Sequence, residues 1–287
     1  MRKHKPQTNP FSSNETASYI HSSSTETSDQ IRQLYPHKPK ANETVAVAVS
    51  GGVDSMVTTL LLKEHEHEVL ALHMVMRPED SPEPGEHIVQ LAARLSVPLH
   101  VVDLRRPFHQ QVIKPFLEAY RRGKTPNPCV ICNPSIKFTL LQQQAVKLGA
   151  TTLATGHYAR LLRDESDGSL RLFRGRERSK DQSYFLYRLD QVQLARSFFP
   201  LGTYLKSEVK KLAADAGMVG YYRPESQEIC FISDKDYKAF LEQHLGSDLP
   251  GPGPVLDLKG QQLGEHGGIH RYTIGQRRGL GIPSSAP

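Results

Sequence analysis

The clearest chemistry in this chain belongs to the segment 50–55, which reads Ser-Gly-Gly-Val-Asp-Ser. It follows an apolar run at 45–49 and precedes a segment with the character of a helix. A glycine turn between a strand and a helix gathers backbone N–H groups around one point, and the helix dipole adds partial positive charge there. Gly51 and Gly52 let an anion approach the backbone closely, while Ser50 and Ser55 add hydroxyl donors. The segment therefore predicts a phosphate-binding loop, with an ordinary strand-to-helix turn as the alternative.

This loop is not of the Walker type, because it lacks the Gly-Lys-Ser/Thr ending of that motif. It resembles the pyrophosphate loop of the ATP pyrophosphatases, enzymes that cleave ATP to AMP and pyrophosphate. The resemblance implies ATP and Mg²⁺ as cofactors, and Asp54 would either orient the Mg²⁺ or cap the helix. It assigns the nucleotide contacts to Ala48, Val49, Ser50, Gly51, Gly52, Val53, Asp54, Ser55, Met74 and Gly156.

Three cysteines, Cys129, Cys132 and Cys230, are too few for a disulfide scaffold and suggest a reducing compartment. The thiolate, rather than the thiol, is the nucleophile in sulfur chemistry. Cys132 directly precedes Asn133, where we expect a helix to begin, and a helix N-terminus lowers the pKa of a thiol. Lys124 and Lys137 add positive charge nearby. Cys230 follows 98 positions later (230 − 132), so any pairing of the two thiols must be made by the fold.

The composition is that of a globular protein of one or two domains, with 287 residues, 38% hydrophobic and 23% charged. The net charge of +6 permits a polyanionic partner without requiring one. No apolar stretch approaches the roughly 20 residues of a membrane helix, so no membrane partner is expected. Residues 1–43 are rich in Ser, Thr and Asn and are predicted to be disordered. Their three early basic residues hint at an organelle transit peptide, but acidic residues and a missing amphipathic pattern count against it.

Strands and helices alternate from residue 45 onward. We expect strands at 45–49, 69–75, 99–104 and 151–155, and helices at 54–65, 86–95, 107–122 and 133–148. This order predicts an α/β fold with a doubly wound parallel sheet, in which ligands bind beyond the carboxyl ends of the strands. The domain boundaries are placed at 44–203 for the ATP-binding catalytic domain and 204–287 for a small α+β domain, to which the family resemblance described below assigns tRNA contacts. A hairpin over 158–174 and helices at 206–216 and through Tyr237, Phe240 and Leu241 complete the prediction.

Further motifs narrow the resemblance. They are Thr-Pro-Asn-Pro-Cys-Val-Ile-Cys-Asn at 125–133, Ile-Lys-Phe at 136–138, Ala-Thr-Gly-His-Tyr at 154–158, Lys-Asp-Gln-Ser-Tyr-Phe-Leu at 180–186, Pro-Leu-Gly at 200–202, Ser-Gln-Glu-Ile-Cys-Phe-Ile at 226–232 and Gly-Gln-Arg-Arg-Gly-Leu-Gly at 275–281. In this order they resemble the tRNA-specific 2-thiouridylases of the MnmA family, within the PP-loop (adenine nucleotide alpha-hydrolase-like) superfamily. The resemblance covers residues 45–283.

The resemblance implies a sulfurtransferase that adenylates the 2-oxygen of the wobble uridine in the tRNA anticodon loop and then replaces that oxygen with sulfur. A cysteine desulfurase or a sulfur-relay protein would load a persulfide on Cys230, and Cys132 would attack it as the nucleophile, releasing sulfide or closing a disulfide. The implied tRNA contacts are Asn127, Pro128, Cys129, Lys180, Asp181 and Gln182. Exposed aromatic faces such as that of Tyr184 suit neighbouring bases.

Cys129 departs from the family pattern, because many members carry Asp at this position. Any role for that carboxylate is therefore in doubt here. Cys129, Cys132 and Cys230 offer a third thiol, which makes an iron–sulfur cluster of the 4Fe–4S type an alternative to the persulfide route. No other metal site is expected with certainty.

Two other functions stay open at this stage. An amide-forming ligase with the same loop would release AMP without tRNA, but it leaves the cysteine motifs unexplained. A tRNA-binding remnant without turnover is the second, because the family usually continues into a C-terminal β-barrel that is absent from this sequence. The expected location is the cytoplasm, with mitochondria or plastids as the alternative.

Overall fold

A computed structural model of the protein describes residues 39–40, 43–77, 80–222, 229–232 and 236–282. Almost all of the predicted disordered segment 1–43 therefore lies outside the described residues. The first elements in chain order are β1 (Thr44–Ala48), α3 (Val53–Glu64), β2 (Glu68–Val75), α4 (Glu86–Arg94), β3 (Leu99–Asp103), α5 (Arg105–Phe108) and α6 (Lys114–Arg121). They are followed by α7 (Pro128–Cys132), α8 (Gln142–Lys147), β4 (Thr152–Ala154), β5 (Ala159–Arg163), β6 (Leu170–Arg174), α9 (Gln191–Ala195), β7 (Ser197–Phe198) and α10 (Lys206–Asp215).

A five-stranded parallel sheet with the order β3-β2-β1-β4-β7 forms the centre of the molecule. The central strand β1 pairs with β2 from Thr44 opposite Glu68, and with β4 from Val45 opposite Thr152. The strand order reverses between β1 and β4, so the crevice for a ligand lies beyond the carboxyl ends of these two strands. The edge strand β7 and the helix α9 before it were not predicted, because they contain only 2 and 5 residues.

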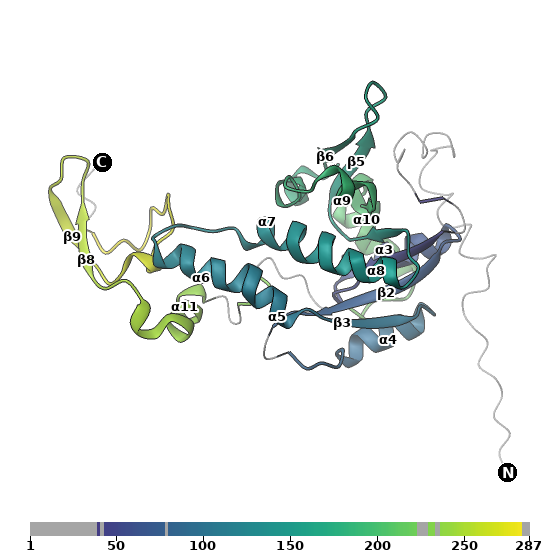
Figure 1. Cartoon of the computed structure of the whole chain (residues 1–287), viewed down its shortest axis with the longest axis horizontal. Coiled ribbons are helices and arrows are strands. Elements are labelled where there is room, and N and C mark those ends of the chain that lie inside the picture. Colours follow the sequence, from purple (N-terminus) through teal and green to yellow (C-terminus); the bar gives the residue numbers. More distant parts are fainter. Residues whose placement is uncertain (1–38, 41–42, 78–79, 223–228, 233–235, 283–287) are drawn as a thin grey trace, which may run out of the picture.

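Helices cover both faces of this sheet (Figure 1). Val45 and Val47 of β1 point into one apolar core, which α3, α4 and α10 close. Ala46 of the same strand points into the other core, which the helices from α5 to α8 close. Successive side chains of β1 thus pack into apolar cores on opposite faces of the sheet, as expected for a central strand of a doubly wound sheet. The predicted α/β architecture is confirmed.

The helix that carries the first two cysteines begins earlier than predicted. Its N-cap is Asn127, whose side-chain oxygen accepts a hydrogen bond from the N–H of Cys129 at 3.1 Å. Pro134 was expected at the start of the helix but lies within it, where a π-helical stretch, Asn133–Leu141, joins α7 to α8. Wider π winding accommodates a proline inside a helix, and the Ser135 hydroxyl donates to the Ile131 carbonyl at 2.7 Å. Cys132 therefore lies at the start of the second turn rather than at a helix N-terminus.

The remaining part of the chain is small and mixed. Helix α11 (Tyr237–Leu245) packs against α6 through stacked rings of Tyr120 and Tyr237, with centroids 5.2 Å apart. An antiparallel hairpin of β8 (Gly253–Leu256) and β9 (Gln262–His266) follows and projects from one end of the molecule (Figure 1). This confirms the predicted small α+β region after the sheet domain.

Candidate functional site

The glycine loop lies at the carboxyl end of β1, at the start of α3. Gly51 adopts a positive φ of 79°, which favours glycine, and Gly52 is the N-cap residue of α3. No side chain caps this helix, so the N–H groups of its first turn remain available to an anion. The Ser55 hydroxyl donates to the Gly52 carbonyl at 3.0 Å and accepts from the Ser50 N–H at 3.3 Å. These bonds hold the loop in its curved form.

Asp54 does not cap the helix; it accepts two hydrogen bonds from outside the loop. Its Oδ1 accepts from Lys206 Nζ at 2.6 Å and from the Tyr158 hydroxyl at 2.8 Å. The Lys206 side chain is only 8% exposed, so the pair is largely removed from water. Sequence reasoning missed Lys206. A signal was present, because Lys206 is the first residue of α10, where the helix dipole disfavours a cation.

Gly156 follows β4 and packs directly against the glycine loop. A Cβ atom added at Gly156 would lie 2.9 Å from the Asp54 Cβ and 3.0 Å from its backbone carbon, so only glycine fits here. His157 is half-buried next to it, and its Nδ1 lies 2.7 Å from the Thr155 hydroxyl. Desolvation of the ring first, and then the positive charge of Lys137, lower the pKa of His157 well below its usual value. A neutral histidine of this kind fits a structural role.

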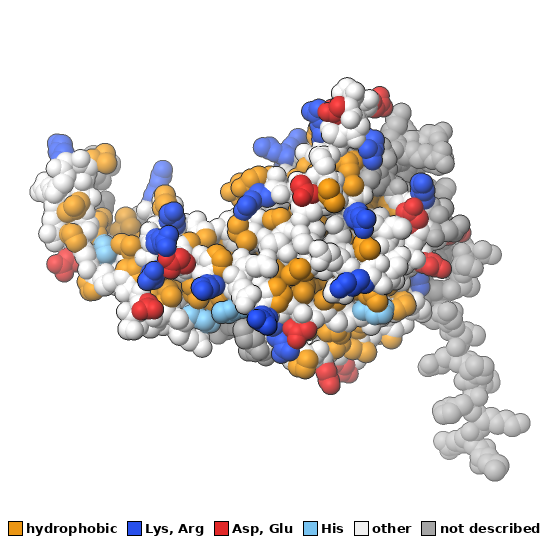
Figure 2. Space-filling model, in the orientation of Figure 1, with side chains coloured by type: hydrophobic (Ala, Val, Ile, Leu, Met, Phe, Trp, Pro, Cys, Tyr) orange, Lys and Arg blue, Asp and Glu red, His pale blue; other side chains and the backbone are white. Residues whose placement is uncertain are grey.

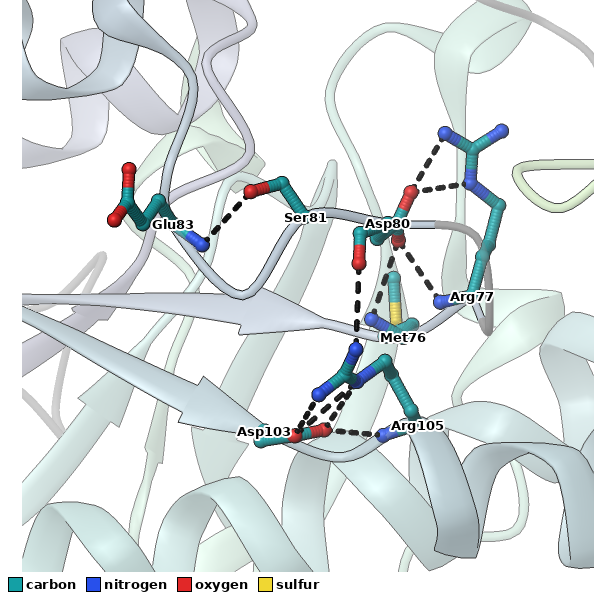
Figure 3. Close-up of polar contacts among 7 residues, drawn as sticks. All are labelled: Met76, Arg77, Asp80, Ser81, Glu83, Asp103 and Arg105. Atoms are coloured by element: carbon teal, nitrogen blue, oxygen red, sulfur yellow. Dashed lines mark hydrogen bonds and ion pairs between the residues drawn. The ribbon is translucent and has the colours of Figure 1, made fainter.

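The loop that follows β2 forms another wall at the same edge of the sheet. Met74 lies half-buried near the end of β2. Beyond it, Arg77 Nε donates to Asp80 Oδ1 at 2.8 Å, and Arg105 Nη1 reaches the Asp80 carbonyl at 3.4 Å (Figure 3). Arg105 also pairs with Asp103 at the end of β3, and its hydrogen bonds lower the pKa of Asp103 to about 2. The hydrogen bond from Arg105 to the Asp80 carbonyl thus joins the loop after β2 to the end of β3, and the two ion pairs fix each side of it.

All three thiols lie within electrostatic range of one another. Cys129 and Cys230 both act on the pKa of Cys132, and Cys129 acts on that of Cys230. Cys230 reaches this place because the next residue, Phe231, is buried edge-on against Phe116, with ring centroids 5.2 Å apart. The fold thus brings together cysteines that the sequence separates. All three are free thiols.

The pKa of each thiol is raised in the structure, whereas the sequence predicted a lowered pKa for Cys132. Burial raises the pKa of Cys132 to about 12 and also raises that of Cys129. Cys230 is exposed as a residue, yet crowding around its sulfur, together with Cys129, raises its pKa as well. The expectation of a lowered pKa for Cys132 was wrong, because this residue lies inside the helix and half-buried. The opposing influence common to all three thiols is Lys137, whose positive charge lowers each pKa.

Removing the charge of Lys137 should therefore make Cys132 less reactive. We expect Lys137→Met to raise the pKa of Cys132 further and to slow its alkylation by iodoacetamide by about 3- to 10-fold below that pKa, the effect of roughly half to one pKa unit. Alkylation followed by peptide mass spectrometry across a pH series measures this. Lys137→Arg should keep the wild-type profile, as should Lys147→Met, which removes an exposed lysine from α8. Unchanged alkylation in Lys137→Met would contradict the assignment.

The described residues contain no group of three His, Cys, Asp or Glu side chains arranged to hold a metal ion. Cys129, Cys132 and Cys230 are among the described residues and form no such group.

The residues expected to contact tRNA fall on two neighbouring segments. Asn127 serves as the N-cap of α7, and Pro128 is buried. In the second segment, the Asp181 carboxylate accepts from the Gly175 N–H at 2.9 Å, and the Gln182 side-chain oxygen accepts from the Tyr158 N–H at 3.1 Å. Tyr158 thereby links this segment, which begins with Lys180, to Asp54 of the glycine loop. Residues 226–228 of the motif before Cys230 lie outside the described residues.

Comparison with known proteins places these features in a family. Residues 43–234 match the family described as "tRNA methyl transferase HUP domain", and residues 238–287 match "tRNA methyl transferase PRC-barrel domain". The tRNA-specific 2-thiouridylase MnmA of Heliobacterium modesticaldum is 44% identical over 255 residues, which are 85% of this chain and 66% of that protein. The chain belongs to the MnmA family of tRNA-specific 2-thiouridylases. A second member, from Oleidesulfovibrio alaskensis, is 47% identical over 250 residues, 85% of this chain and 70% of its own.

The chain thus spans about two thirds of the length of the MnmA relatives that it matches. Among solved structures, a 4-thiouridine synthetase–RNA complex with bound ATP is 19% identical, covering 62% of this chain and 42% of that chain with a TM-score of 0.43, a weak likeness. Within the part of the chain that the structure describes, every helix is too short or too polar to span a lipid bilayer.

Proposed function

We propose that the chain is an ATP-dependent tRNA 2-thiouridylase. The observation that supports this proposal is a chain of neighbours, Lys137, His157 and Gly156, that leads from the thiols to the glycine loop. Lys137 acts electrostatically on all three cysteines and on His157, and the neighbour of His157, Gly156, packs against Asp54 of the loop. A phosphate-binding loop and a group of thiols in one place suit an enzyme that activates an oxygen with ATP and then replaces it with sulfur.

In the first step the 2-oxygen of the wobble uridine attacks the α-phosphorus of ATP. The bond to the β-phosphate breaks, and pyrophosphate leaves toward the N–H groups at the start of α3 and the hydroxyls of Ser50 and Ser55. Both hydrogen bonds to the Asp54 carboxylate end on Oδ1, so Oδ2 would be the oxygen that holds the Mg²⁺ accompanying ATP. Lys206 holds Asp54 in this orientation.

In the second step sulfur replaces the activated oxygen. The outer sulfur of a persulfide on Cys230 attacks C2, the C2–O bond breaks, and AMP leaves with that oxygen. The Cys132 thiolate then attacks the inner sulfur on Cys230, which releases 2-thiouridine and closes a disulfide between the two cysteines. A thiol reductant supplies the two electrons that reopen it. Alternatively, Cys132 attacks the persulfide first and frees hydrosulfide, which then attacks C2.

Because the pKa of Cys132 is about 12 in this structure, its thiol is protonated at neutral pH. The reaction therefore requires that the pKa of Cys132 falls before the attack. Lys137 is the cation that lowers this pKa. The sulfur donor is a cysteine desulfurase or a relay protein that delivers a persulfide. We place the enzyme in the cytoplasm, a reducing compartment in which free thiols persist.

Pyrophosphate release and tRNA filter binding, measured together, test this function. We expect tRNA to bind and to stimulate the release of AMP and pyrophosphate, with no stimulation by small acids or amines. Turnover driven by a small acid without tRNA would favour an amide-forming ligase. Binding of tRNA without any turnover would instead show a tRNA-binding remnant. Either result would overturn the proposal.

A further inference from the structure

Two large aromatic side chains stand exposed on a rigid segment next to the candidate site. Tyr184 and Tyr187 are each 62% exposed, although both lie between β6 and α9 rather than in a terminal tail. Their rings lie 5.8 Å apart with an interplanar angle of 37°. The Phe185 ring meets the Tyr184 ring edge-on, with centroids also 5.8 Å apart and an interplanar angle of 73°. The result is a small aromatic surface that faces solvent.

The backbone beneath this surface is fixed at several points. Leu186 and Leu189 are buried in the apolar core and anchor the segment from below. The Asp181 carboxylate accepts from the Ser183 hydroxyl at 2.8 Å, and the Gln182 N–H donates to the Tyr158 carbonyl at 3.0 Å. Exposed aromatics on a fixed backbone are pre-organised for a flat ligand, because little conformational entropy is lost on binding.

This surface is continuous with the thiol site. The side-chain amide of Asn133, a buried residue, donates to the Phe185 carbonyl at 3.0 Å. Asn133 directly follows Cys132 in the chain, so one hydrogen bond joins the helix of the nucleophile to the aromatic segment. In Figure 1 the stretch between β6 and α9 lies beside α7, in agreement with these contacts.

The chain on either side of this surface carries arginines, and their charge favours an anionic partner. Among the described residues, Arg174, Arg178 and Arg188 form no ion pair, whereas Arg171 and Arg176 pair with acidic side chains. Figure 2 shows hydrophobic side chains beside Lys and Arg side chains on the face above α7. Aromatic faces flanked by unpaired arginines are the combination that binds single-stranded nucleic acid, whose bases stack while its phosphates contact the cations.

From these observations we propose that Tyr184 and Tyr187 form a stacking platform for the anticodon-loop bases that flank the target uridine. The inference rests on the proposed function, since it takes tRNA as the substrate. Extruding one base into the thiol site leaves its neighbours unstacked, and a platform joined to that site through Asn133 and Phe185 offsets the loss. The platform thus holds the RNA loop open while the chemistry proceeds.

The absence of tryptophan from this chain gives a direct test. Tyr184→Trp introduces a single tryptophan, which can be excited selectively at wavelengths beyond the tyrosine absorption, and Val192→Trp is the matched control at a 72% exposed position on α9. We expect an anticodon stem–loop RNA to quench the fluorescence of Tyr184→Trp and to leave that of Val192→Trp unchanged. A stem–loop that is abasic at the nucleotides flanking the target should quench Tyr184→Trp far less.

Affinity measurements complete the test. Tyr184→Ala and Tyr187→Ala should each weaken RNA binding by about 5- to 100-fold, and Tyr184→Phe should retain it. If wild-type protein binds tRNA and releases pyrophosphate but these variants bind normally without quenching, the platform is wrong while the proposed function stands. If the variants lose only sulfur uptake from a donor protein, the surface serves that protein and the inference falls. If wild-type protein binds no RNA, both proposals fall.

Discussion

Replacing either Cys132 or Cys230 with serine is expected to abolish 2-thiouridine formation, by more than about a thousandfold, because each variant lacks one of the two sulfur atoms of the transfer. A hydroxyl has nearly the size of a thiol, so the fold should persist, but its oxygen neither carries a persulfide nor attacks one at neutral pH. Both variants should still bind ATP, since neither residue belongs to the glycine loop. Mass spectrometry of nucleosides from treated tRNA measures the product.

Cys129→Ser separates the persulfide route from the cluster. In the persulfide route Cys129 is dispensable for sulfur transfer. Its serine variant should keep at least about a tenth of the activity, because the helix-capping hydrogen bond to Asn127 comes from the backbone N–H of residue 129 and not from the thiol. A cluster held by all three thiols would make Cys129→Ser as inactive as the other two variants and would require iron in the active protein. Thiolation by both Cys132→Ser and Cys230→Ser would contradict the assigned roles.

Removing Lys206 is expected to stop the first half of the reaction. Lys206→Met leaves the carboxylate of Asp54 in the loop without its cation, so that the carboxylate turns away or repels the phosphates of ATP. We expect tRNA-dependent AMP formation to fall by about a hundredfold or more, comparable to the loss of one electrostatic catalytic group. We expect a loss of unfolding free energy of about 2 kcal/mol, below the range for fully buried pairs because Asp54 is 31% exposed. Pyrophosphate release and denaturant unfolding measure the two effects.

Two controls distinguish function from stability in this case. The double variant Asp54→Asn/Lys206→Met removes both charges and should recover most of the lost stability, yet it should remain inactive. Lys210→Met changes an exposed lysine of the same helix and should match the wild type in both assays. Full AMP formation by Lys206→Met would show that the pair with Asp54 is only structural.

Much of the fold could be predicted because local patterns determine it. The apolar run at 45–49 is buried on both faces of the sheet and therefore identifies a central parallel strand. The order of strands and helices then predicts the crevice at their carboxyl ends. The start of the helix at Asn127 was missed because Pro134 usually marks a first turn, whereas here a π-helical stretch and the Ser135 hydroxyl accommodate it inside the helix.

The electrostatics of the site could not be predicted from sequence. Cys132 has cations as near neighbours in the chain, which favours a low pKa, but its burial depends on residues far away, including those around Cys230. Lys206 lies 152 positions from Asp54 (206 − 54), and only the packing of α10 against α3 joins them. Pairings of this kind are properties of the tertiary structure.

The most direct test of the whole account is a single reaction that contains the protein, ATP, unmodified tRNA and a persulfide donor, with AMP and 2-thiouridine quantified together. A shared pocket for activation and sulfur delivery predicts one AMP for each 2-thiouridine formed, and Cys230→Ser should form no 2-thiouridine. If 2-thiouridine accumulates without AMP, or if its formation is indifferent to both Cys132 and Cys230, nucleotide activation and sulfur transfer do not meet at the edge of this sheet.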